Sequence, residues 1–383
     1  MIRKTICLMT LSLVADCAFA QSSVTLYGVL DAGINYVNND GGKSNVTMTT
    51  GLIQGNRWGL KGTEDLGGGL KAIFQLENGF TMSNGTLGQG GRMFGRQAWV
   101  GISSDRLGTL TAGRQYDSVV DYVQQFSGII YTGLAHPFDN DNFDNSIRLD
   151  NTIKYTNKSF KGLTFGGLYG FSNSANNGEP NSGFAVNRVW SVGGSYSVGS
   201  MNFGAGYMHL NTPGSNQVGA APDYINLSTT SALQVNGLTS PVLRSDVLGV
   251  GGAYSFNGAR VAFVYSHTIF DTKSDKLTFD NYEVNASYFI TPALSVSGIY
   301  TFTDGKLRST GASPKYHQVQ LIGDYFLSKR TDVYLLGAWQ RAAGDATVAS
   351  IAPDTFGTGG SAAPDASTTK NQILVRIAMR HKF

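Results

Sequence analysis

The sequence predicts an all-β protein, an antiparallel β-barrel of about 16 strands that crosses a membrane. Three observations support this prediction: hydrophobic residues alternate with a period of two, short and long connectors alternate along the chain, and aromatic residues recur near the ends of the alternating segments. No segment sustains the 3.6-residue period of an amphipathic helix, which argues against a helical domain.

The alternation is clearest in the last segment of the chain. There Ile373, Val375 and Ile377 share one face, and Gln372 and Arg376 share the other. Similar alternation recurs in residues 24–36, 71–77, 163–171, 261–269, 282–290 and 294–302. A strand with one apolar and one polar face fits a barrel wall between lipid and water.

The connectors fall into two groups. Tight links occur at residues 66–69, 160–162, 198–200, 257–258, 291–292 and 328–330. Longer polar stretches occur at residues 38–50, 84–92, 175–186, 213–243 and 344–370. This alternation predicts an up-and-down barrel with short turns at one rim and long loops at the other.

A soluble β-sandwich or a solenoid is the alternative to a membrane barrel. The mean hydropathy of −0.10 agrees with either, because every second residue of a membrane β-strand faces water. Aromatic residues lie near the segment ends, among them Tyr36, Trp58, Tyr155, Phe171, Tyr207, Phe256 and Phe383. Rings at these places suit the two membrane interfaces and favour the membrane barrel.

The first 20 residues have the pattern of a secretory signal peptide. A cationic start is followed by an apolar run, and Ala18-Phe19-Ala20 predicts cleavage between Ala20 and Gln21. Residues 21–383 then form a single barrel domain without cysteine. The chain has 29 basic and 26 acidic side chains, a balance that argues against a nucleic-acid partner.

Several stretches closely resemble the general porins of Gram-negative bacteria, of the β-proteobacterial type. They are SSVTLYGVLDAGINY (22–36), NRWGLKGTEDLGGGLKAIFQLENGF (56–80), GRMFGRQAWVGIS (91–103), LGTLTAGRQYD (108–117) and the terminal MRHKF. The resemblance implies a 16-stranded barrel and a homotrimer in outer-membrane lipid and lipopolysaccharide. It also implies passive diffusion of ions and small hydrophilic solutes, and a terminal Phe383 that the outer-membrane assembly machinery reads.

In that family the third long loop folds into the barrel, and its acidic groups face basic residues of the wall. Carried over by motif, the basic residues are Arg57, Arg96 and Arg148, with Lys61 and Lys154 added by period-two counting. The expected acidic side is the loop of residues 117–147, with Asp117, Asp121, Asp139, Asp141 and Asp144. Arg114 is expected to serve structure or the subunit contact.

Physical reasoning supports a lumenal position for Arg148 and Lys154. They alternate with Leu149, Ile153 and Tyr155, and a charge facing lipid near the midplane would cost about 2–4 kcal/mol. Three basic residues of the last segment, Arg376, Arg380 and Lys382, are likewise expected to face the lumen and to favour anions.

Other functions are less well supported by the sequence. Residues 139–144 lack the glycine and the terminal glutamate of a calcium loop, and the five histidines have no metal-binding spacing. No nucleophile elbow points to a hydrolase, so no catalytic residue, metal or cofactor is predicted. A substrate-specific channel, or an adhesin or receptor that binds through loops 213–243 and 344–370, remains an alternative to a general pore.

Overall fold

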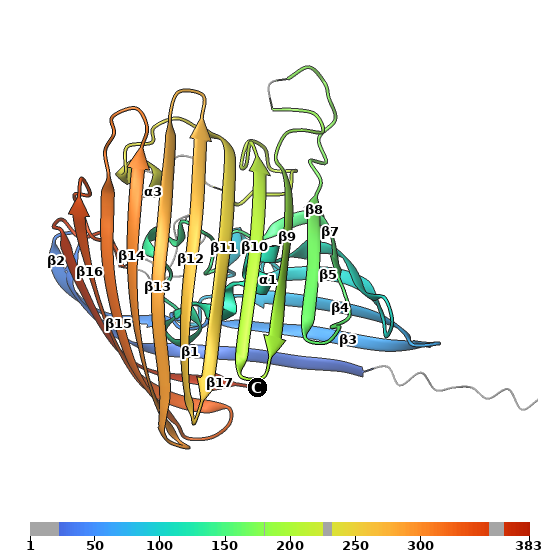
Figure 1. Ribbon diagram of the computed structural model, residues 1–383, viewed down its shortest axis with the longest axis horizontal. Coiled ribbons are helices and arrows are strands. Elements are labelled where there is room, and N and C mark those ends of the chain that lie inside the picture. The colour runs from blue at the N-terminus through green and yellow to red at the C-terminus, as the bar shows by residue number, and fades with distance from the viewer. Residues whose placement is uncertain (1–22, 180, 225–231, 352–363) are drawn as a thin grey trace, which may run out of the picture.

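The computed structural model describes residues 23–179, 181–224, 232–351 and 364–383, which form a closed barrel of antiparallel strands (Figure 1). The predicted signal peptide and its cleavage site lie outside the described residues, as do parts of loops 213–243 and 344–370. The strands are β1 (Ser23–Asp40), β2 (Lys43–Thr50), β3 (Arg57–Gly67), β4 (Leu70–Gly79), β5 (Gln97–Ser104), β6 (Gly108–Gln115), β7 (Leu149–Thr156), β8 (Leu163–Gly170), β9 (Arg188–Val198), β10 (Met201–Asn211), β11 (Val242–Phe256), β12 (Ala259–Thr272), β13 (Lys276–Thr291), β14 (Leu294–Leu307), β15 (Pro314–Phe326), β16 (Thr331–Gly344) and β17 (Asn371–Lys382).

The barrel is 16-stranded although 17 strand segments are described, because β2 and β3 occupy one position in the wall. Both pair with β1 at different heights, with Thr50 of β2 opposite Ala32 and Arg57 of β3 opposite Val29. Residues 51–56 leave the wall between them. The last strand, β17, pairs with β1 over residues 29–37 and closes the barrel.

The two faces of the wall follow the predicted alternation. In β17 the apolar side chains of Ile373, Val375 and Ile377 are exposed on the outer face, and Gln372 and Arg376 are buried on the inner face. Polar residues also fill the inner face of β13, where Asn281 and Glu283 are buried. The prediction of a barrel with an apolar outer face is therefore confirmed.

The prediction of a long loop over residues 38–50 is wrong. The chain turns at Gly41 and Gly42, both of which have positive φ, and continues directly into β2. Val46 and Met48 alternate with polar residues and are 68% and 65% exposed on the outer face. Asparagine and threonine occur on both faces of this stretch. The alternation of apolar and polar residues is therefore difficult to recognise in the sequence.

The C-terminal residue fits against a glycine of the first strand. The backbone N–H of Gly28 donates to the carbonyl of Phe383, and the N–H of Phe383 donates to the carbonyl of Gly28. A Cβ at position 28 would lie only 2.3 Å from Cζ of the Phe383 ring. This contact therefore requires a residue without a side chain.

Replacing Gly28 by alanine is expected to destabilise the barrel by about 1–3 kcal/mol, the usual cost of overpacking a close contact. The urea midpoint for unfolding in detergent or lipid measures the loss. Gly337→Ala is the matched control, because a Cβ there meets nothing within 4 Å. Equal midpoints for the two variants would contradict a specific fit between Gly28 and Phe383.

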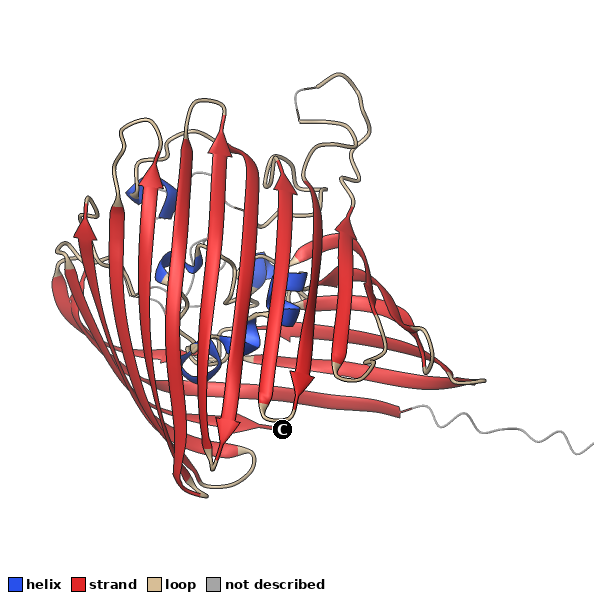
Figure 2. Cartoon of the chain, in the orientation of Figure 1, coloured by secondary structure: helices blue, strands red, loops and turns tan. Residues whose placement is uncertain are grey.

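Residues 116–148 connect β6 to β7 and pack against the inner face of the wall. They contain α1 (Ser118–Tyr122), η2 (Gln124–Phe126), α2 (Ile129–Thr132) and η3 (Pro137–Asp139). Figure 2 shows these helices between the near strands and the far wall of the barrel. Val119, Phe126 and Phe143 belong to one buried cluster with apolar residues of the wall strands.

Glycines in the wall make room for this connection. A Cβ on Gly204 would meet the Tyr122 carbonyl at 2.2 Å, and one on Gly251 would meet Phe126 at 2.9 Å. The remaining helices of the described residues are η1 (Gln89–Gly91) in the β4–β5 connection and α3 (Ala232–Val235) in the β10–β11 connection. No helix in the described part of the chain is long and apolar enough to cross a membrane.

Candidate functional site

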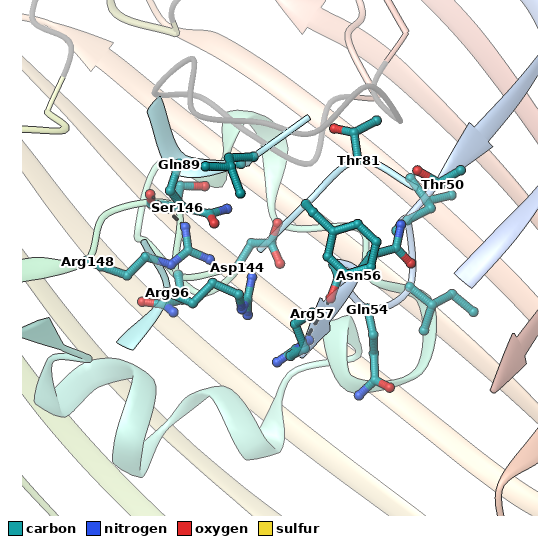
Figure 3. A pocket seen from close by; sticks show the side chains of 18 of the residues that line it. Thr50, Gln54, Asn56, Arg57, Thr81, Gln89, Arg96, Asp144, Ser146 and Arg148 are labelled. Atoms are coloured by element: carbon teal, nitrogen blue, oxygen red, sulfur yellow. Dashed lines mark hydrogen bonds between the residues drawn. The ribbon is translucent and has the colours of Figure 1, made fainter. Parts of the chain in front are cut away.

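A cavity of about 540 Å³ lies between the β6–β7 connection and the wall formed by β2, β3 and the β4–β5 connection. Arg57, Arg96 and Arg148 line it together with Asp144 (Figure 3). The remaining lining is mostly polar and includes Thr50, Gln54, Asn56, Thr81, Gln89, Asn145 and Ser146. Three cations and one carboxylate therefore share one polar space.

Arg57 reaches the cavity because residues 51–56 depart from the wall just before it. Asp31 fixes the path of these residues. Its backbone N–H donates to Oδ1 of Asn56, and its side chain accepts from the N–H of Leu52. Nε of Arg57 donates to the carbonyl of Gly55 at 3.0 Å. The guanidinium is thus oriented by backbone rather than by a carboxylate.

Arg96 and Arg148 each stand one residue before a wall strand, β5 and β7 respectively. Nε of Arg96 donates to Glu77 at 2.7 Å, and its Nη2 donates to the hydroxyl of Tyr116 at 3.3 Å. Nη1 of Arg148 donates to the carbonyl of Ser146 at 3.2 Å. Both side chains are mostly buried, so their positions are fixed by these contacts.

The positive charge at the cavity exceeds the negative charge beside it. Arg96 is paired with Glu77, but among the described residues no carboxylate lies within ion-pair distance of Arg57 or Arg148. Nε of Arg148 is buried without a hydrogen-bond partner in the described part of the chain. Burial and the neighbouring Arg96 lower the pKa of Arg148 to about 10, which leaves it charged at neutral pH.

Of the five predicted acidic residues, only Asp144 is among those that line the cavity. Asp139 does not line the cavity and is fully buried. It accepts hydrogen bonds from the N–H of Asp144 at 2.8 Å and from the hydroxyl of Ser146 at 2.7 Å. Asp139 therefore shapes the turn that presents Asp144.

Asp141 points away from the cavity into a buried polar network on the opposite wall. His136 lies between two carboxylates, with Nδ1 2.6 Å from Asp141 and Nε2 2.9 Å from Glu283 of β13. Asp141 also accepts from Ser266 of β12 and Asn281 of β13. This network fastens the β6–β7 connection to the wall.

The attachment of the β6–β7 connection to the wall through His136 is expected to weaken as the pH rises. Burial disfavours the charged form of His136, but Asp141 and Glu283 outweigh burial and raise its pKa from 6.5 to about 10. A raised pKa stabilises the folded arrangement fully below pH 6.5, and this contribution is lost as the pH rises through 10. Open-channel current noise should therefore increase between pH 7 and pH 10.

His136→Gln should remove this pH dependence, because glutamine does not titrate. His381→Gln, at the exposed end of β17, is the control and should retain it. An equal rise in noise in the His136 variant would contradict the assignment to this histidine.

The remaining residues predicted for the constriction are Asp117, Asp121, Lys61 and Lys154, and each has different contacts. Asp117 caps α1 by accepting from the N–H groups of Val119 and Val120, and burial followed by the charge of Asp121 raises its pKa to about 6. Asp121 pairs with Lys154 at 2.6 Å. Lys61 is exposed, with Nζ 5.5 Å from the ring centre of Tyr27.

The basic residues of β17 are placed on the inner side of the wall or at its end. Arg376 is fully buried and paired with Asp31. Arg380 pairs with Asp324 and Asp332, and Lys382 is exposed at the end of the strand. The two arginines are thus balanced by carboxylates, unlike Arg57 and Arg148.

Glu283 and His136 hold the connection that bounds the cavity, and the sequence reasoning did not single them out. A signal for Glu283 was present, since it alternates with Tyr282 and Val284 and so belongs to the inner face with Asn281. In the described part of the chain, no group of three or more histidine, cysteine or acidic side chains is placed to hold a metal ion.

Comparison with known proteins identifies relatives over nearly the whole chain. A family model for the Gram-negative porin matches residues 6–345. An outer membrane porin protein of Bordetella pertussis is 33% identical over 370 residues, covering 85% of this chain and 91% of the relative. Outer membrane porin protein 32 of Delftia acidovorans is 28% identical and is covered in full, as is this chain.

Solved structures agree with these relatives. The anion-selective porin from Comamonas acidovorans superposes with a TM-score of 0.75 at 25% identity, covering 95% of this chain and all of the other. OmpT of Vibrio cholerae, in a trimer form, shares the fold with a TM-score of 0.68 at 15% identity, covering 94% and 99% of the two chains. With its closed 16-stranded barrel, the chain belongs to the Gram-negative porin family, whose members are outer-membrane channels rather than enzymes.

Proposed function

We propose that the channel is a general diffusion pore whose narrowest part lies between the β6–β7 connection and the wall that carries Arg57, Arg96 and Arg148. In this proposal residues 117–147 are the inward-folded loop, and the cavity of about 540 Å³ is the space through which solutes pass. The observation that carries the proposal is the convergence of three arginines and Asp144 on that one space.

The pore prefers anions over cations. Arg57 and Arg148 have no ion-paired carboxylate among the described residues, so the neighbouring Glu77 and Asp144 offset only part of the positive field of the three arginines. Low-dielectric walls concentrate such a field in a narrow aqueous gap. The similarity to the anion-selective porin from Comamonas acidovorans supports the same preference.

The proposed assembly is a homotrimer in lipid and lipopolysaccharide. The apolar outer face described above supports contact with lipid, and the trimer form of the similar Vibrio cholerae channel accords with this stoichiometry. Phe383 acts as the assembly signal in this proposal. Its backbone pairing with Gly28 would complete the barrel once the strand has been recognised.

The conductance of the reconstituted protein, measured against salt concentration, tests the proposed function. A general diffusion pore should give stepwise currents, grouped in threes for an intact trimer, that rise in proportion to the KCl concentration. A substrate-specific channel should instead saturate with its solute. The absence of conductance would favour the adhesin or receptor alternative.

A further inference from the structure

The β10–β11 connection brings a carboxylate to two arginines behind the cavity wall. Asp223 accepts from Nη1 of Arg92 at 2.7 Å and from Nη2 of Arg114. Asp223 and Arg114 are both mostly buried. Neither Asp223 nor these two arginines is among the described residues that line the cavity.

Arg114 binds the backbone at two places, beside Arg96 and at Arg148. Its Nε donates to the carbonyl of Gly95, the residue before Arg96, at 2.8 Å. Its Nη1 donates to the carbonyl of Arg148 at 3.2 Å and to the carboxylate of Asp150. One guanidinium therefore joins the main chain at two of the three cavity arginines.

Arg92 extends the same arrangement to a third part of the cavity wall. Its Nη1 donates to the carbonyl of Gln89 at 2.9 Å, and Gln89 lines the cavity. Asp223 thus binds two arginines that also donate to main-chain carbonyls at or beside residues of the cavity wall, and Arg114 has a second carboxylate partner in Asp150. A carboxylate fixes such guanidinium groups because charge-assisted hydrogen bonds are stronger than neutral ones.

The backbone around Asp223 is itself fastened to the barrel. The N–H of Ala220 donates to the carbonyl of Asn187 at 2.7 Å, and the N–H of Asp150 donates to the carbonyl of Ala220 at 2.8 Å. The N–H of Ala221 donates to Oδ1 of Asn187 at 3.0 Å. The carboxylate is therefore presented by an anchored segment.

We propose that Asp223 is a positioning residue for ion selection: acting through Arg114 and Arg92, it fixes the backbone that carries Arg96 and Arg148. The β10–β11 connection then determines the selectivity of a constriction that it does not line. This inference rests on the proposed anion preference of the cavity.

Asp223→Asn tests the inference through the sign of its effect. Removing a negative charge near the pore would, by the long-range field alone, increase the preference for anions. Loss of positioning should do the opposite and lower the chloride-to-potassium permeability ratio by about twofold or more. Reversal potentials in a KCl gradient measure this ratio on channels whose folded state is verified by heat-shifted gel mobility.

Two further variants complete the test. Asp223→Glu retains the carboxylate and should restore most of the ratio. Asp345→Asn removes an exposed carboxylate from the β16–β17 connection and should leave the ratio unchanged. In an Arg148→Gln background, Asp223→Asn should have a smaller effect, because one of the side chains it positions is already gone.

An unchanged or increased ratio in Asp223→Asn would overturn the inference. That result is distinct from failure of the proposed function. If the ratio responds to Arg148→Gln but not to Asp223→Asn, the constriction assignment stands and the positioning role fails. If neither variant changes the ratio, the constriction assignment itself fails.

Discussion

Replacing Arg57 and Arg148 by glutamine is expected to abolish the preference for anions. Each change removes a guanidinium that has no paired carboxylate among the described residues, so the field inside the cavity changes directly. At an effective dielectric constant near 20, losing one charge about 6–16 Å from a passing anion costs that anion about 1–3 kcal/mol. The chloride-to-potassium permeability ratio of the double variant should fall by about tenfold or more.

Arg106→Gln is the matched control for this experiment. Arg106 lies in the exposed turn between β5 and β6 and is not among the residues that line the cavity, so the ratio should be retained. Arg96 is left intact because its removal would leave the buried Glu77 without its ion-pair partner. The resulting loss of protein stability would accompany any change in ion selectivity, and the two effects could not be separated. A double variant with the selectivity of the original protein would show that the cavity is not the selective part of the pore.

Replacing Glu283 by alanine is expected to release the β6–β7 connection from the wall. Its carboxylate accepts from the hydroxyl of Ser127 at 2.8 Å and the N–H of Gly128 at 2.6 Å, and it lies 2.9 Å from Nε2 of His136. Breaking a buried charged network by removing one partner costs about 3–5 kcal/mol. Because β13 keeps its ladder with β12 and β14, the barrel should still form.

The released connection should be visible in the current. We expect Glu283→Ala to raise the single-channel conductance and to increase open-channel noise, since the cavity is bounded on one side by this connection. Glu64→Ala, which removes an exposed carboxylate of β3, is the control and should leave both quantities unchanged. Quiet channels of unaltered conductance in the Glu283 variant would mean that the other contacts suffice to hold the connection.

The barrel could be predicted from sequence because its determinants are local. A strand between lipid and water alternates apolar and polar residues, and Ile373 to Ile377 show this without reference to any other segment. Residues 38–50 resemble a loop in sequence because asparagine and threonine can occupy either face of a strand. Only the pairing with β1 reveals the hairpin.

The site could be predicted only in part because it depends on contacts between distant segments. Arg96 shares sequence parity with Val100 and Ile102, which are exposed on the outer face, so alternation alone would place Arg96 on the outer face as well. The structure resolves this, because β5 begins at Gln97 and Arg96 precedes the regular strand. Resemblance to a family, rather than periodicity, placed Arg96 among the cavity residues.

The acidic stretch of residues 139–144 illustrates the same limit. Asp139, Asp141 and Asp144 are close in sequence, yet they have three different roles in the structure. Asp144 lines the cavity, Asp139 shapes the turn beneath it, and Asp141 binds His136 and the far wall. Positive φ at Asp139 and Asn142 turns successive side chains in different directions, which no spacing rule anticipates.

The most direct test of the proposed mechanism is the reversal potential of the reconstituted channel under a KCl gradient at neutral pH. If Arg57, Arg96 and Arg148 dominate the constriction, the potential should have the sign of a channel that passes chloride more readily than potassium. A potential of the opposite sign, or one near zero, would contradict the account.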